Sequence, residues 1–255
     1  MQHACKTDEG IINAICEEEK ELTDTQAKAR NKFTDEQLLI RPHSEDWEDI
    51  AFYDEFHFGI GPQITKRIKR RRGREYRYLP HNVHRKKVTS KDTKAKAREE
   101  GHLDLLNIGV IVGKDYRKLI PYKVDNNVGK MTTQCYTETI LPALIEDLTS
   151  RGFTLCQDAD SAYISKATTA WAKEHGLSIL TLPGKSPDFS VMESMAMPLK
   201  RAFHAVRSTS TKKALDRFNR IFTEEMDQDT VNGMYKWYTK RLHECRRADG
   251  QMTRY

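Results

Sequence analysis

The stretch FYDEFHF, residues 52–58, places two carboxylates, Asp54 and Glu55, inside a run of aromatic residues. Ile50 and Ala51 precede it, so the pattern predicts a largely buried strand from about residue 49 to residue 58. A carboxylate in such a strand costs several kcal/mol unless it is paired or holds a metal ion. Asp54 is therefore the first candidate for a functional side chain.

Two further acids occupy comparable places in the sequence. Asp158 ends the apolar run FTLCQD, and Glu193 follows SPDFSVM at the start of a segment with helical apolar spacing. Acids at two strand ends and on one helix are the donor pattern of a carboxylate metal site. Asp54, Asp158 and Glu193 are the predicted catalytic and metal-binding residues.

Each acid also has an ordinary structural explanation. Asp54 could be a hydrogen-bonded core acid, and Asp158 could be a turn residue at a strand end, where Asp160 competes for its role. Glu193 stands three residues after Ser190, which is the spacing of a helix capping box.

The composition indicates a soluble globular protein with no membrane partner. The 255 residues are 38% apolar and 31% charged, and no apolar run approaches the roughly 20 residues that a membrane helix needs. The N-terminus has no signal-peptide pattern, so an intracellular location is expected. The five cysteines form no CxxC pair, and we interpret them as free thiols.

The net charge of +6 is concentrated in one segment. Residues 66–98 hold 15 Lys or Arg and two acids, a local charge of +13, so the rest of the chain carries −7. Apolar residues interrupt the cations in KRIKRRRGREYRY, a pattern that favours contact with nucleic acid over a solvated charged face. The predicted DNA-binding residues are Lys66, Arg67, Lys69, Arg70, Arg71, Arg72, Arg74, Arg77, Lys86 and Lys87.

The order of the predicted elements indicates an α/β fold. A helix near residues 23–33 with a capping box at Thr23, a short helical turn at residues 44–47 and the first strand come first. A second strand over residues 74–79 and a mobile loop over residues 83–102 are expected next. Residues 105–112 and 116–124 read as a hairpin, and Thr132 caps a helix that Pro142 should kink.

The second half of the chain alternates strands with helices. Strands are predicted at residues 153–158 and 177–182, with a helix at residues 165–175 between them that Gly176 ends. A later helix has an apolar side, and residues 212–245 are helical in pattern. The members of that apolar side are Met192, Met195, Ala196, Leu199, Phe203 and Val206. An antiparallel hairpin followed by parallel strands gives a mixed sheet flanked by helices, as in the ribonuclease H-like fold.

Several motifs, in order, resemble the DDE transposases of the mariner superfamily, especially the Tc-like branch common in fungi. These motifs are WEDIAFYDEFHFGIGPQ at residues 47–63, RRRGREY at 70–76, VDNNVGKMTTQCYTETILPALI at 124–145, QDADSAY at 157–163, WAKEHGLSILTLPGKSPDFSVMES at 171–194 and ADGQMTRY at 248–255. Thirty-four residues separate Asp158 from Glu193, which is similar to the interval of that family. The resemblance covers about residues 44–255.

The resemblance implies a chemistry for the three acids. Two Mg²⁺ ions, for which Mn²⁺ can substitute, would activate a water or a 3′-hydroxyl and neutralise the leaving oxygen during cleavage and strand transfer. Asp54 would bridge both ions, Asp158 would complete one site and Glu193 the other. A TA dinucleotide is the target that the family implies.

The sequence departs from the family beside these acids. Ala159 stands where the family has Asn or Gly, Tyr163 replaces its His, and Ser190-Val191 and Ala196 replace Asn-Pro and Trp. Only about 43 residues precede Trp47, whereas the family has paired helix-turn-helix modules there. We expect a helical N-terminal segment at 1–43, a ribonuclease H-like catalytic domain at 44–210 with a basic insertion at 66–102, and a helical extension at 211–255.

These expectations define the alternatives. The first is a metal-dependent transposase catalytic domain in the nucleus, with double-stranded DNA as its partner and either a homodimer or a second protein that supplies end recognition. The second is an inactive, domesticated or decaying DNA-binding remnant. The third is a structural or interaction protein derived from the element.

Overall fold

The computed structural model describes residues 22–60, 104–124, 126, 130–206, 208 and 210–253. One sheet contains β1 (Ile50–Ile60), β2 (Asp104–Gly113), β3 (Tyr116–Tyr122), β4 (Thr154–Gln157) and β5 (Ile179–Thr181). The α-helices are α1 (Asp24–Ile40), α3 (Thr133–Cys135), α4 (Leu141–Arg151), α5 (Lys166–Glu174), α6 (Val191–His204), α7 (Thr211–Arg220), α8 (Gln228–Tyr235) and α9 (Tyr238–Arg247). Shorter turns are η1 (Glu45–Trp47), η3 (Tyr136–Ile140), η4 (Pro187–Phe189) and η5 (Ile221–Glu225).

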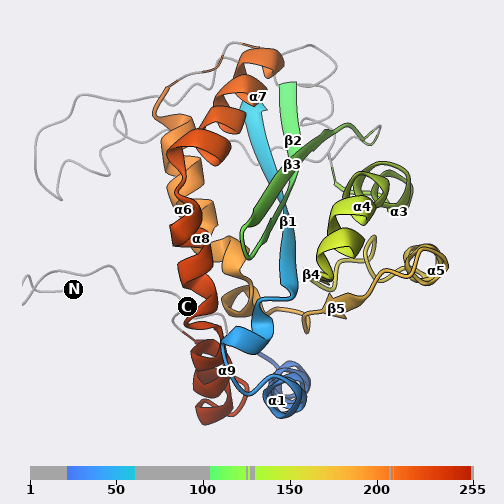
Figure 1. The fold of residues 1–255 in the computed structure, drawn as a ribbon, viewed down its shortest axis with the longest axis vertical. Helices are drawn as coiled ribbons and strands as arrows, with labels where there is room; N and C mark the ends of the chain where they lie inside the picture. Colours follow the sequence, from blue (N-terminus) through green and yellow to red (C-terminus); the bar gives the residue numbers. More distant parts are fainter. Residues whose placement is uncertain are drawn as a thin grey trace, which may run out of the picture.

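The sheet is mixed, as the sequence predicts. Its strand order is β3-β2-β1-β4-β5, with antiparallel pairs from β3 to β1 and parallel pairs from β1 to β5. The helices α6 and α8 lie along one side of the sheet, and α4 and α5 lie on the other (Figure 1). The predicted strand at 74–79 and the predicted loop at 83–102 lie outside the described residues.

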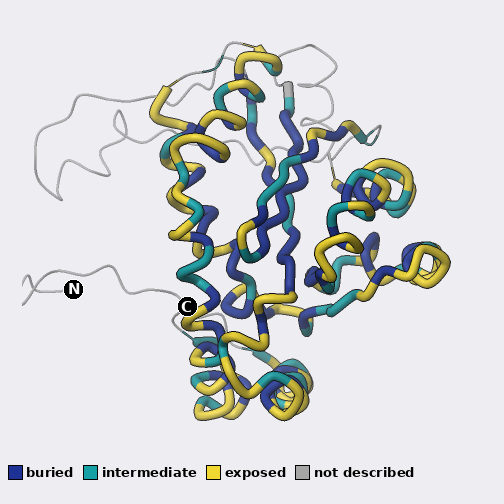
Figure 2. The backbone as a smooth tube through the Cα atoms, viewed as in Figure 1, coloured by how far each residue is buried: buried dark blue, intermediate teal, exposed yellow. Residues whose placement is uncertain are grey.

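The side chains of FYDEFHF alternate between the two faces of the central strand β1. Successive side chains of a strand point to opposite faces. Phe52, Phe56 and Phe58 belong to the core beneath α6–α9, and Tyr53 belongs to the core beneath α4 and α5. Both faces of β1 are buried (Figure 2), and alternation places Asp54 on the face that α6 covers.

Most predicted helices form at the predicted places. The capping box at Thr23 is present, because Gln26 N–H donates to the Thr23 hydroxyl and Thr23 N–H donates to the Gln26 side chain. The helix runs further than predicted, to Ile40. On α6, five of the six predicted apolar residues are buried, but Val206 lies beyond the helix end and is 56% exposed. The prediction for Val206 was wrong because the helix ends at His204.

The helix after Thr132 is irregular before Pro142, the residue predicted to kink it. Thr132 caps the helix, and a π-helical turn, η3, ends two residues before the proline. Proline has no N–H and its ring clashes with the carbonyl four residues before it, so a widened turn accommodates it. The four residues at a spacing of four, Tyr136, Ile140, Leu144 and Leu148, are all fully buried.

A buried ion pair ties the start of the described chain to its end. Arg30 on α1 donates two hydrogen bonds to Asp188, of 2.8 and 2.7 Å, and neither side chain is exposed by more than 1%. Arg30 also donates to the carbonyls of Lys185, Gly250 and Gln251. Because Asp188 lies in η4, directly before α6, this pair fixes the segment that leads into the helix of Glu193.

The chain end closes tightly over α1. Thr253 donates two hydrogen bonds to Asp188, and Gly250 has a φ of +81°. A Cβ added at Gly250 would lie 2.0 Å from the carbonyl oxygen of Ala27. No helix in the described part of the chain is long and apolar enough to cross a membrane.

Gly250→Ala therefore tests this closure. Gly176 is a matched control, because its φ is +66° but a Cβ there would meet nothing within 4 Å. We expect Gly176→Ala to lower the free energy of unfolding by about 1 kcal/mol, from backbone strain alone. Gly250→Ala should lower it by about 2–4 kcal/mol, because overpacking against Ala27 adds to the strain. Urea unfolding measures both free energies. Equal losses for Gly250→Ala and Gly176→Ala would contradict the close packing of Gly250 against Ala27.

Candidate active site: a carboxylate pocket

The three acids singled out in the sequence line one pocket. Its volume is about 340 Å³, and Asp54, Asp158 and Glu193 all contribute to its wall. Asp54 comes from the middle of β1, Asp158 from the residue after β4, and Glu193 from the first turn of α6. The parallel pairing of β1 with β4 brings the first two together, and α6 brings the third.

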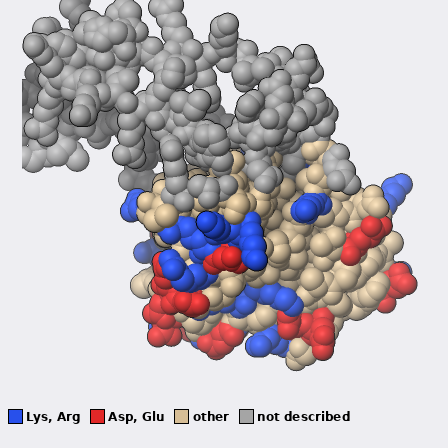
Figure 3. Space-filling view, turned by 90° about the horizontal axis from the view of Figure 1, so that it is seen from above, with Lys and Arg blue, Asp and Glu red and all other residues tan. Residues whose placement is uncertain are grey.

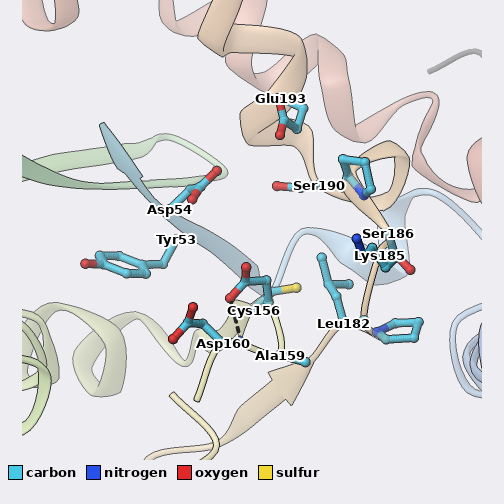
Figure 4. Close-up of a pocket in the computed structure, with 14 residues that line it drawn as sticks. Tyr53, Asp54, Cys156, Ala159, Asp160, Leu182, Lys185, Ser186, Ser190 and Glu193 are labelled. Atoms are coloured by element: carbon cyan, nitrogen blue, oxygen red, sulfur yellow. Dashed lines mark hydrogen bonds between the residues drawn. The ribbon is translucent and has the colours of Figure 1, made fainter. Parts of the chain in front are cut away.

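The carboxylates of Asp54 and Glu193 are directed into the same space from β1 and α6 (Figure 4). Asp54 Oδ1 accepts a hydrogen bond of 2.7 Å from the N–H of Glu55. Its only described hydrogen bond therefore comes from its own neighbour, and no cation of the described residues pairs with it. Asp54 is thus a hydrogen-bonded acid without a cation partner in the described structure, and its second oxygen has no described hydrogen bond.

Asp158 and Asp160 have different surroundings. Asp158 Oδ1 accepts a hydrogen bond of 3.0 Å from the N–H of Asp160. Asp160 lines the pocket but pairs with Lys130, at 2.9 Å between Nζ and Oδ2, and also accepts from Ala162 N–H. Since Asp160 is occupied by Lys130, Asp158 is the better candidate for a metal ligand.

The capping-box explanation of Glu193 does not hold. The Ser190 hydroxyl caps α6 by accepting from the N–H of Met192 at 3.2 Å, not from that of Glu193. Within the described ranges, the Glu193 side chain has no hydrogen bond or ion pair, and it is exposed at the pocket wall. Its carboxylate is available for a ligand.

The neighbouring Glu55 is held on the opposite face of the sheet. The hydroxyl of Tyr163 donates to Glu55 Oε1, and His57 Nε2 lies 3.1 Å from Glu55 Oε2. His57 Nδ1 lies 2.9 Å from Asn107 Oδ1. The hydrogen bond to Glu55 and the one to Asn107 raise the pKa of His57, against the effect of burial. Glu55 is therefore committed to these partners, and Asp54 is the strand carboxylate that faces the pocket.

The pocket concentrates negative charge. Burial raises the pKa of Asp54 to about 6, and the charges of Asp158, Glu193 and Glu55 add to this, although the hydrogen bond from Glu55 N–H opposes it. Burial also raises the pKa of Asp158, with Asp160 and Glu55 contributing, against the effects of the Asp160 N–H and Lys130. Such mutual repulsion is relieved when a cation binds.

The donor set fits a hard divalent cation. Carboxylate oxygens suit Mg²⁺ and Mn²⁺, and all three acids have at least one oxygen without a described hydrogen bond. Among the described residues, no three His, Cys, Asp or Glu side chains converge closely enough to hold one ion. An ion in this arrangement would be held by a pair of carboxylates, and Asp54 interacts electrostatically with both Asp158 and Glu193.

Two residues of the pocket were missed in the sequence. Lys185 lies at the wall with a φ of +62°, and the hydroxyl of Ser186 is buried without a hydrogen-bond partner in the described structure. Both belong to the turn PGKSPD before α6, where a lysine beside a glycine was the only available signal. A cation and an unsatisfied hydroxyl in an acidic pocket suit a phosphate oxygen as ligand.

The ten predicted DNA-binding residues, from Lys66 to Lys87, lie outside the described residues. Their role stays a prediction, as do the domain boundaries at residues 43 and 210.

The fold is similar to that of several solved structures of Mos1 mariner transposase. The catalytic domain of Mos1 mariner transposase matches with a TM-score of 0.66 over 92% of this chain and 98% of that chain, at 13% identity. The Mos1 strand transfer complex matches with a TM-score of 0.67 over 96% of this chain and 68% of that chain, at 14% identity. The Mos1 catalytic domain has also been solved with raltegravir and Mn. No family model and no curated protein matches the sequence.

These likenesses confirm the ribonuclease H-like fold class. At such low identity they show the fold alone, so the roles of Asp54, Asp158 and Glu193 depend on the geometry of the pocket.

Asp54→Asn tests how much the charge of Asp54 lowers the free energy of unfolding. A carboxyl whose pKa is raised from 3.8 to about 6 by folding binds more protons in the folded state, so stability falls as pH rises from about 4 to 6. At pH 7.5 in EDTA, Asp54→Asn should raise the free energy of unfolding by on the order of 1–3 kcal/mol, and by much less at pH 4.

The matched control is Glu146→Gln, which removes an exposed carboxylate whose side chain has no hydrogen bond or ion pair in the described structure. Urea unfolding at the two pH values gives the comparison. Destabilisation by Asp54→Asn at pH 7.5 would show that the carboxylate has a stabilising partner, contrary to this description of the pocket.

Proposed function

We propose that this chain is the catalytic domain of a mariner-like transposase, a divalent-metal-dependent DNA endonuclease and strand transferase. The observation that carries the proposal is the meeting of Asp54, Asp158 and Glu193 in one pocket on a fold similar to the Mos1 catalytic domain. These acids are far apart in sequence, and none of them forms an ion pair among the described residues. Asp54 and Asp158 each accept one backbone hydrogen bond and keep a second oxygen for a ligand.

In this proposal each acidic residue of the pocket has a role in cation binding. Asp54, Asp158 and Glu193 would hold the divalent cations, with Asp54 contributing to both sites, Asp158 to one and Glu193 to the other. When bound there, Mg²⁺ or Mn²⁺ supplies charge neutralisation at phosphate oxygens and lowers the pKa of an attacking water. Lys185 and Ser186 line the same pocket, and the Lys185 ammonium would contact a phosphate oxygen there.

The finer parts of the proposal come from the resemblance in the sequence and from the neighbouring structures. Mos1 has been solved with Mn and with Mg, in paired-end complexes and in a strand transfer complex. By analogy we propose two bound ions, double-stranded DNA as substrate, a TA target, assembly as a dimer or with an end-recognition protein, action in the nucleus and membership of the fungal Tc-like branch.

The second candidate is a DNA-binding remnant without cleavage activity. The observation that favours it is the methyl side chain of Ala159, which lines the pocket beside Asp158 and offers no ligand.

Nicking of supercoiled plasmid by the purified chain distinguishes the two candidates. With Mn²⁺ or Mg²⁺ the wild type should nick, whereas Asp54→Asn, Asp158→Asn and Glu193→Gln should each fall to the rate of a reaction without protein. Glu146→Gln, prepared identically, should nick at the wild-type rate. A wild type that never exceeds Asp54→Asn would favour the remnant.

The pH dependence of nicking should also depend on the metal concentration. Protonation of Asp54 competes with cation binding, and its pKa is about 6 without metal. The rate should therefore fall as pH drops through about 6 at low Mn²⁺, and this acid limb should move to lower pH as Mn²⁺ rises. An acid limb that stays fixed over a wide range of Mn²⁺ concentration would exclude Asp54 as a ligand that competes with protons.

A further inference from the structure

The exposed side of α6 begins at the pocket and leads away from it. Glu193, Met197, Lys200, Arg201 and His204 fall within one side of the helix at 100° per residue, opposite the buried side. Glu193 is the single acid on α6, so the remainder of this side is neutral or positive. We call these five residues the α6 track.

The track follows the central strand. The Lys200 Nζ lies 5.7 Å from the centre of the Phe56 ring, and the His204 ring lies 5.8 Å from that of Phe58. The side chains after Glu193 therefore run beside β1 in the same direction as Asp54, Phe56 and Phe58. In Figure 1, α6 lies alongside β1 and ends near α7.

The sheet is open beside this track. β4 pairs with β1 only at residues 50–52, so from Tyr53 to Phe58 that edge of β1 has no partner strand in the described part of the chain. Among the described residues, β4 therefore ends its pairing with β1 just before Asp54.

Positive charge continues onto α7. Arg217 donates to the carbonyls of Ala202 and Phe203 and so fixes α7 to the end of α6. Lys212 and Lys213 are exposed on α7, and Arg220 is also exposed but pairs with Glu225 at 3.1 Å. Seen from the end of the molecule that carries α7, Lys and Arg side chains gather in one area, bordered by acidic side chains (Figure 3).

Arg201 is available for an external ligand. Its side chain is exposed and has no hydrogen bond or ion pair within the described residues; its carbonyl accepts from the N–H of Ala205. Met197, also on the track, is 65% exposed. An unpaired guanidinium and a polarisable apolar side chain, in line with an acidic metal pocket, match a polyanion that continues beyond the reacting phosphate.

We propose that the α6 track binds the backbone of double-stranded DNA on one side of the scissile phosphate. This inference rests on the proposed function. A rise of about 1.5 Å per residue places Lys200 and His204 roughly 10 and 16 Å along the helix from Glu193. With about 3.4 Å per phosphate on one strand, the track meets the third to fifth phosphate from the cut.

The test compares two double variants that each remove two positive charges from an exposed helix. Lys200→Gln with Arg201→Gln alters the track but keeps most of the aliphatic stems. Lys166→Gln with Lys173→Gln alters α5, on the other side of the sheet. Binding of a labelled 30-base-pair duplex by the full chain is measured by anisotropy over a range of KCl, in EDTA so that no cutting occurs.

The track variant should flatten the slope of log K against log salt by about 2, since each lost phosphate contact removes about 0.9. The α5 variant should leave the slope unchanged. Other cations of the chain keep the variant bound, so the slope is the informative quantity. Equal slopes for the two variants would overturn the proposal.

A second measurement does not depend on the folding of variants. Saturating duplex should slow the oxidation of Met197 by peroxide in the wild type and leave that of Met234, on α8, unchanged; an unprotected Met197 would also overturn the proposal. Both readouts are independent of cleavage. If the slope difference and the Met197 protection are found but the chain does not nick DNA, the DNA-binding role of the α6 track holds and the proposed catalytic function fails. If the chain nicks DNA but neither readout is found, the catalytic function holds and the role of the track fails.

Discussion

Inside the fold, the guanidinium of Arg30 and the carboxylate of Asp188 meet where neither reaches solvent. Removing one partner of such a pair would leave a buried charge, which costs about 3–5 kcal/mol. This pair joins α1, the turn before α6 and the chain end through Gly250, Gln251 and Thr253. The position of Glu193 depends on that turn, so the N-terminal helix and the last residues support the pocket although they do not touch its acids.

The pocket itself shows the opposite use of charge. Arg30 and Asp188 neutralise one another, whereas Asp54, Asp158 and Glu193 have no cation partner among the described residues, apart from the influence of Lys130 on Asp158. We propose that a bound cation offsets this cost. In the described structure β4 pairs with β1 only as far as Phe52, and the positive side of α6 runs beside β1 from there. We propose that a long polyanion reaches the pocket along this side of α6.

Much of this could be predicted from the sequence, and the failures have local causes. The alternation in FYDEFHF predicted β1, because period-two burial is a local rule. The sequence also predicted that Asp54, Asp158 and Glu193 meet, but Asp54 lies in the middle of β1 and not at a strand end as expected. The Arg30–Asp188 pair could not be predicted, since its partners are 158 residues apart and each looks like a surface charge. The contact of Tyr163 with Glu55 could not be predicted either. The sequence showed Tyr163 only as a difference from the family, whereas in the structure its hydroxyl donates to Glu55 on β1.

We propose that the three carboxylates bind divalent cations jointly, with Asp54 contributing to two sites. The decisive measurement is Mn²⁺ binding to the purified chain at pH 7.5, counted by electron paramagnetic resonance of the free ion. The wild type should bind two ions, Asp158→Asn and Glu193→Gln should each weaken or lose one, and Asp54→Asn should lose both. Undiminished Mn²⁺ binding by Asp54→Asn would show that Asp54 is not a ligand.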